Sequence, residues 1–145
     1  MADRDPSEPA GSGGKEQPFV GAPDDITQPW WDATRERRLV VQRCSACDHR
    51  QHYPRPICLA CGSYELEWLP CSGDATVHSF TIVRRELGAA FDTPHVVALV
   101  DLAEGPRLTT NLVGAEVDAW SCDESVRLTW RALSDGRHLP QFEKA

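Results

Sequence analysis

The stretch CSACDHRQHYPRPICLAC, residues 44–61, decides how this chain is organised because it contains two Cys-x-x-Cys pairs ten residues apart. Each such turn places two sulfurs on one side of the chain, so two facing turns supply the four thiolates of a tetrahedral Zn²⁺ site. The spacer is shorter than in the common zinc-ribbon pattern but allows a compact rubredoxin-like loop, and Gly62 suits a tight turn after the second pair. The sequence therefore predicts one structural metal per chain, bound by Cys44, Cys47, Cys58 and Cys61.

Zinc is the favoured metal, although iron uses the same four-thiolate ligand set. A redox role would need one reactive pair at the start of a helix in a βαβ unit, and the sequence has no such pattern. Four thiolates leave no open coordination position, so the site is predicted to be structural, and Asp48, His49 and His52 are expected to be solvated. Cys71 and Cys122 stand alone and are expected to be small buried hydrophobic residues.

The composition is that of a globular protein, with 145 residues, 41% hydrophobic and 26% charged. The net charge of −7 weighs against a protein that binds nucleic acid freely, because such binding depends on neutralising phosphates. We see no apolar run of membrane length and no secretory signal, and we expect a cytoplasmic protein whose thiols stay reduced.

Four segments are predicted from the changes in pattern along the chain. Residues 1–23, rich in Gly, Pro and charge, are expected to form a disordered tail. Residues 24–43 are expected to form a helix, with Thr27 as N-cap and Pro29 in the first turn, followed by a strand. The zinc ribbon is placed at residues 44–70 and a β-rich unit at residues 71–145.

The β-rich unit carries segments of strand character separated by turn residues. This density of strands and turns predicts a small barrel or sandwich. Val77 lies out of phase with Phe80 and Ile82, which predicts a bulge, and Pro140 favours an edge position for the last strand. The expected strands are residues 75–85, 95–102, 107–113, 126–133 and 138–142.

The predicted helix carries Trp30 and Trp31 side by side. Both could pack against the protein's own sheet, or one could be exposed and anchor a partner, since Trp and Arg are enriched at interface hot spots. Between the cysteine pairs, two prolines restrict the loop that carries Tyr53 and Arg55. This loop either serves only to connect the two cysteine turns, or it presents Tyr53 and Arg55 in fixed positions to a partner. The predicted partner-binding residues are Trp30, Trp31, Arg35, Arg38, Tyr53 and Arg55.

Taken in order, the segments RLVVQRCSAC, YPRPICLACGS, LEWLPCSGDATVHSFTIV and EGPRLTTNLVG resemble the DUF35 family of OB-fold proteins with a rubredoxin-like zinc ribbon. The resemblance covers about residues 24–142. It implies a mainly β fold: an N-terminal helix, a Cys₄ zinc ribbon and a C-terminal OB-fold barrel of about five strands. Cys71, Cys122 and Trp120 are not part of the family pattern.

Family members are often encoded beside thiolase-like or lipid-transfer-protein-like enzymes, or beside or fused to MaoC-like hydratases. In steroid side-chain degradation, such a domain pairs with a thiolase-like protein to form a retro-aldolase that cleaves a β-hydroxyacyl-CoA, and the partner holds the catalytic residues. The resemblance therefore implies a non-catalytic accessory subunit for acyl-CoA chemistry. We expect two copies to flank a two-fold symmetric thiolase-like dimer.

Two other functions remain open at the level of the sequence. Zinc ribbons and OB-folds also bind single-stranded nucleic acid, although the expected strands carry few lysines. A stand-alone acyl-CoA binder is the other alternative, with Arg84, Arg85 and Arg107 as candidate ligands of the CoA phosphates.

Overall fold

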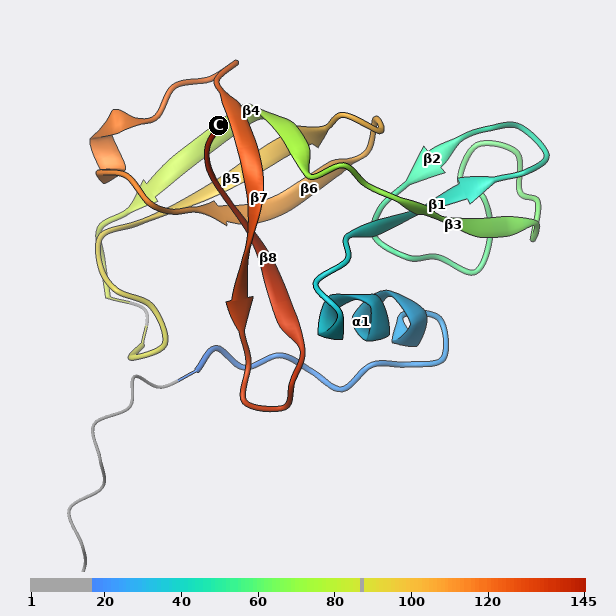
Figure 1. Ribbon diagram of the computed structural model, residues 1–145, viewed down its shortest axis with the longest axis horizontal. Coiled ribbons are helices and arrows are strands. Elements are labelled where there is room, and N and C mark those ends of the chain that lie inside the picture. Colours follow the sequence, from blue (N-terminus) through green and yellow to red (C-terminus); the bar gives the residue numbers. More distant parts are fainter. Residues whose placement is uncertain (1–16, 87) are drawn as a thin grey trace, which may run out of the picture.

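The computed structural model describes residues 17–86 and 88–145, so most of the predicted disordered tail lies outside the described residues. Figure 1 shows a barrel beside a smaller sheet, with the helix α1 below the smaller sheet. The elements are α1 (Gln28–Arg35), β1 (Val40–Cys44), β2 (Arg50–Gln51), β3 (Leu66–Pro70), β4 (Asp74–Val83), β5 (His95–Leu102), β6 (Arg107–Leu112), the 3₁₀ helix η1 (Val117–Ala119), β7 (Ser125–Ala132) and β8 (His138–Lys144).

The strands form two separate sheets. The first is antiparallel with the order β2-β1-β3 and carries the cysteine loops, and the second is a closed barrel with the order β4-β5-β6-β8-β7. A five-stranded barrel closed by one parallel contact, β6 with β8, is the arrangement of an OB-fold. The predicted fold class, mainly β with one N-terminal helix, a ribbon and a barrel, is confirmed.

The barrel core is built by alternation of buried and exposed residues, which is strict along β5. On β5, Val96, Ala98, Val100 and Leu102 are buried, and the residues between them are partly exposed. On β4 the register shifts between Val77 and Ser79, which confirms the predicted bulge. The bulge lets one long strand pair with β5 along most of its length and with β7 at its start, as closure of a small barrel requires.

Closure of the barrel depends on a single position where β6 and β8 run parallel. Leu112 pairs with Phe142 there, and the Val113 N–H donates to the Phe142 carbonyl at 2.9 Å. Phe142 is fully buried. Its ring therefore fills the core at the point where the two strands of the seam meet.

Helix α1 buries both of its tryptophans, so of the two alternatives, packing against the protein itself is correct and exposure of one ring is not. Trp30 and Trp31 are 4% and 7% exposed, and their rings meet edge to face with centroids 4.7 Å apart. Successive residues of a helix point about 100° apart, so the two rings reach different neighbours. Trp30 packs on His52 and Tyr53 of the ribbon, whereas Trp31 lies under Arg137 of the barrel.

Arg137 also fixes the segment that leads into the helix. Its guanidinium, 4.6 Å from the Trp31 ring, donates to the carbonyls of Val20 and Gly21 and pairs with Asp135. Residues 17–21 therefore lie against the β7–β8 turn, beneath the barrel in Figure 1, although the sequence predicts disorder up to residue 23. Among the described residues, no helix is long and apolar enough to cross a bilayer.

We predict that Phe142→Ala lowers the free energy of unfolding by about 3–5 kcal/mol, because it leaves a cavity at the barrel seam. Chemical denaturation followed by tryptophan fluorescence measures this. Phe19→Ala is the matched control, since that ring is 96% exposed and its removal should change stability by less than about 0.5 kcal/mol. Equal effects of the two substitutions would contradict the role assigned to Phe142.

Candidate metal centre

The two cysteine pairs form two knuckles with the same backbone geometry. In the first, the Asp48 N–H donates to the Cys44 carbonyl at 2.8 Å, and in the second, the Gly62 N–H donates to the Cys58 carbonyl at 2.9 Å. Asp48 and Gly62 both have left-handed backbone, with φ of 63° and 74°. Glycine adopts this conformation without cost and Asp tolerates it, so each pair turns sharply back on itself. The turn predicted at Gly62 is confirmed.

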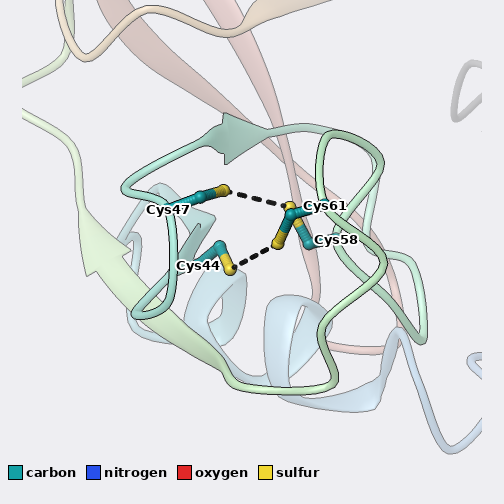
Figure 2. A group of neighbouring side chains, drawn as sticks. All are labelled: Cys44, Cys47, Cys58 and Cys61. Carbon is teal, nitrogen blue, oxygen red and sulfur yellow. Dashed lines mark hydrogen bonds between the residues drawn. The ribbon is translucent and has the colours of Figure 1, made fainter.

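These knuckles bring the four sulfurs together, as Figure 2 shows. The Cys44 and Cys61 sulfurs are 3.7 Å apart, those of Cys47 and Cys58 are 3.6 Å apart, and all four lie within 4.8 Å of one another. A tetrahedron with metal–sulfur bonds of about 2.3 Å has edges of about 3.8 Å. The predicted ligand set therefore fits one tetrahedral metal ion, and soft thiolates suit zinc or iron.

The backbone around Cys58 favours the thiolate that a metal ligand requires. Burial of Cys58 opposes ionisation, but hydrogen bonds from the backbone N–H groups of Cys61 and Ala60, together with contacts to the Cys47 and Cys61 thiols, lower the pKa of the thiol to about 6. The Ala60 N–H lies 3.4 Å from the Cys58 sulfur. Amides aimed at sulfur are the means by which a knuckle stabilises the charge it presents to a metal.

Two buried glutamines hold the loop between the knuckles. Gln42 of β1 accepts from the Arg55 N–H at 2.8 Å and donates to the Arg55 carbonyl at 3.0 Å. Gln51 donates to Gln42 and to the Ile57 carbonyl, and accepts from the Leu59 N–H. Side-chain amides thus take the place of a sheet partner for this loop. Sequence reasoning missed both glutamines, because an isolated polar residue gives no signal of burial.

The remaining cysteines differ from each other. Cys71 is partly buried, and burial raises the pKa of its thiol to about 12, which keeps it neutral at physiological pH. Cys122 is exposed, so the expectation that it is buried is wrong; it lies in the turn before β7. Neither thiol is near the metal-binding group.

A groove of about 410 Å³ lies where the ribbon, α1 and the barrel meet. We call it the junction groove. It is lined by Trp30, Trp31, His52, Tyr53, Arg107, Leu108, Thr109, Thr110, Asn111, Leu139 and Pro140.

His52 is the member of the junction groove that sequence reasoning placed wrongly. It was expected to be solvated, but its ring packs on Trp30 and Tyr53, with ring centroids 5.5 Å and 5.4 Å away. Burial lowers the pKa of His52 to about 4, so the imidazole is neutral at physiological pH. The position of His52 in the loop between the two cysteine pairs did not predict its burial, because the contact with Trp30 depends on how the helix packs on that loop.

The predicted partner-binding residues are only partly brought together. Trp30, Trp31 and Tyr53 share the junction groove, and Tyr53 is 38% exposed. Arg35 donates to the Asp135 carbonyl at 2.6 Å, and Arg38 pairs with Glu36 at 2.8 Å. Arg55 is exposed and held by its backbone. Arg35 at the end of α1 and Arg38 in the segment after it therefore bind the protein's own surface.

The three arginines predicted to bind CoA phosphates do not form one site. Arg84 and Arg85 follow β4 beside the start of β5, whereas Arg107 faces Asp101 at the other end of β5, about 20 Å along the strand. Arg107 pairs with Asp101 at 2.7 Å, and Arg84 pairs with Asp118 at 2.7 Å. Their assignment to CoA phosphates stays a prediction, but the β4–β5 hairpin places Arg84 and Arg107 too far apart to contact one phosphate group.

Comparison with known proteins identifies both parts of the chain. Residues 31–67 match the ChsH2 rubredoxin-like zinc ribbon domain, and residues 68–131 match the ChsH2 C-terminal OB-fold domain. A DUF35 domain-containing scaffold protein of Pyrococcus furiosus is 34% identical over 117 residues, which are 80% of this chain and 85% of that protein. The chain belongs to the DUF35 family.

Other relatives of this DUF35 protein have names from acyl-CoA metabolism. A probable enoyl-CoA hydratase alpha subunit of Thermomonospora curvata is 40% identical over 80% of this chain, which spans only 36% of that protein's length. The benzoylsuccinyl-CoA thiolase subunit BbsA of Geobacter metallireducens is 40% identical over 63% of this chain and 60% of its own. A solved structure, the Ltp2-ChsH2(DUF35) aldolase, aligns with a TM-score of 0.80 and 38% identity over 86% of this chain and 98% of that one.

We predict that Cys58→Ser reduces bound metal from about one ion per chain to near zero, because three thiolates cannot close the tetrahedron. Elemental analysis of the purified protein measures this, and the amide spectrum of residues 44–65 should lose its dispersion. Cys122→Ser is the control, since that exposed thiol lies outside the cluster. Full metal content in Cys58→Ser would refute the assignment of this ligand.

We predict that His52 makes folding less favourable as the pH decreases. Its pKa is lowered to about 4 by burial, whereas the unfolded value is about 6.5, so the unfolded chain takes up the proton first. Stability should fall between pH 6.5 and pH 4, by at most about 3 kcal/mol. Denaturation of wild type and His52→Phe across this range isolates the effect, because the variant keeps a ring but cannot titrate; identical pH dependence would contradict it.

Proposed function

We propose that this DUF35 protein is a non-catalytic accessory subunit that binds a thiolase-like partner acting on acyl-CoA. The observation that carries the proposal is the similarity, at a TM-score of 0.80 and over 98% of the neighbour, to a chain of the Ltp2-ChsH2(DUF35) aldolase. The similar proteins have the names of a scaffold, a hydratase subunit, a thiolase subunit and an aldolase. What they share is membership of an assembly rather than one reaction.

The chemistry of the chain supports a division of labour with the partner. Four cysteines fill the coordination sphere of a tetrahedral ion, so that ion has no position for water or substrate. We propose zinc as this ion, with the role of holding the ribbon. Cys71 carries a thiol whose pKa is raised, and Arg84 and Arg107 of the barrel are each paired with a carboxylate and lie far apart. Nucleophile and general base are therefore assigned to the partner.

The reaction we propose for the complex is retro-aldol cleavage of the side chain of a steroid, which carries the β-hydroxyacyl-CoA thioester. The β-hydroxyl gives up its proton and becomes a carbonyl while the bond between Cα and Cβ breaks. The electron pair moves to the thioester enolate, which is then protonated at Cα. The partner's groups perform these steps, and we propose two copies of each chain around the partner's two-fold axis.

The barrel face offers little to a nucleic acid. Two shallow grooves on β5 are lined by Phe80, Phe91, His95 and Val97 together with small neutral residues, and no Lys or Arg is among their lining residues. Proteins that bind single strands combine stacking rings with a basic groove. The net charge of −7 adds to this mismatch, so a protein partner fits this surface better.

Co-expression with a thiolase-like protein from the same genome tests the proposal. We expect the two chains to elute together in size-exclusion chromatography, with one zinc per copy of this chain. Cleavage of a β-hydroxyacyl-CoA should need both chains, and the partner alone should show little activity. A zinc-loaded chain that elutes alone and shifts single-stranded DNA with steep salt dependence would overturn the proposal.

A further inference from the structure

The junction groove contains two buried nitrogen atoms without hydrogen-bond partners in the described chain: Nε1 of Trp30 and Nδ1 of His52. Trp30 is only 4% exposed, and its N–H can act only as a donor. Leaving such a group unpaired in the interior is unfavourable, because its hydrogen bond to water is lost and not replaced. A ligand in the groove that offers an acceptor at this position would recover that cost.

On the barrel wall of the same groove, the register of β6 and β8 implies that β8 supplies no donor to two backbone carbonyls. Leu102 N–H donates to the Pro106 carbonyl, so the alternation of the hairpin directs the backbone groups of Arg107 and Thr109 away from β5 and toward the groove. The parallel ladder with β8 would next offer the N–H of residue 140 to the Thr109 carbonyl. Residue 140 is proline, which has no N–H.

The backbone N–H of His138, two residues before Pro140 in β8, also does not donate to β6. The N–H of His138, which continuation of the ladder would bring to the Arg107 carbonyl, instead lies 3.4 Å from Oγ1 of Thr34 in α1. The Pro140 carbonyl accepts from the Thr110 hydroxyl at 2.9 Å, so the seam is closed by a side chain at that point. Residues 107–109 of β6 therefore form a short open edge, and Trp30 and Tyr53 line the same groove.

We propose that the junction groove binds an extended polypeptide segment of the thiolase-like partner, which pairs with the open edge of β6 and accepts a hydrogen bond from Trp30 Nε1. The inference rests on the proposed function and names the surface that would serve it. An extended peptide carries N–H donors for the carbonyls of Arg107 and Thr109 and carbonyl acceptors for the indole. Addition of a strand to an open sheet edge is a common mode of peptide recognition.

The groove also accommodates the side chains of an extended segment. A strand presents alternate side chains to one face, and the wall opposite β6 offers the aromatic rings of Trp30 and Tyr53, with Leu139 beside them. The neutral His52 adds a second nitrogen for the segment's backbone. Apolar contact and backbone pairing therefore coincide in one place.

Trp30→Phe tests the inference because it removes the N–H and keeps most of the ring. We expect the dissociation constant for the co-expressed partner, measured by calorimetry with the zinc-loaded chain, to rise about tenfold. Trp120→Phe is the matched control: Trp120 is also buried, its Nε1 also lacks a partner, and it does not line the groove. This control should bind like wild type.

A second pair of variants keeps the test independent of folding. Thr109→Trp places bulk in the groove from an exposed position and should abolish binding, whereas Thr76→Trp, exposed on β4 and outside the groove, should not. Hydrogen exchange of the wild-type complex should show new protection at residues 28–35, 52–55 and 107–111. Wild-type affinity in both Trp30→Phe and Thr109→Trp, with a stable complex, would overturn this inference and leave the proposed function intact.

Two other outcomes also decide the matter. If the wild-type chain binds no thiolase-like protein, the proposed function fails and this inference fails with it. If coenzyme A alone protects the same three segments and Trp30→Phe weakens its binding, the groove is a cofactor site, and the polypeptide assignment is wrong. Absence of protection by coenzyme A, together with the loss caused by Thr109→Trp, supports the peptide.

Discussion

The structure depends first on four cysteine sulfurs placed at the corners of one tetrahedron. Within the ribbon loops, the fully buried side chains are mainly Cys44 and Cys58, so an apolar core does not hold this unit together. Backbone amides that point at sulfur, and two glutamines that bind the spacer, fix the loops around the ion. The metal thus takes the place of the core that so short a segment cannot build.

Helix α1 connects the ribbon to the barrel through packed side chains. One tryptophan packs on the knuckle spacer and the other lies under a barrel arginine, so the ribbon, the helix and the β7–β8 turn share one set of contacts. The loop that carries Tyr53 is fixed from one side by Gln42 and from the other by Trp30. A surface made of parts from three elements is consequently held in one shape, which lowers the entropy lost on binding a partner.

This division of labour explains how one fold could serve several reactions. Four cysteines complete the coordination sphere of the ion, and Arg84 and Arg107 of the barrel are each paired with a carboxylate. We propose that such a chain contributes shape and hydrogen bonds to an assembly while the reacting groups are on another chain. Relatives with names as different as hydratase, thiolase and aldolase subunits are consistent with this arrangement.

The sequence by itself determined the metal ligands, the turn at Gly62, the order of helix, ribbon and strands, and the bulge in β4, because each depends on residues close together in the chain. Only the tertiary structure decided that both tryptophans are buried, that His52 is neutral against Trp30, and that Arg84 and Arg107 lie at opposite ends of a hairpin. These features depend on how α1 docks and how strands pair, and contacts between distant segments leave no local pattern in the sequence.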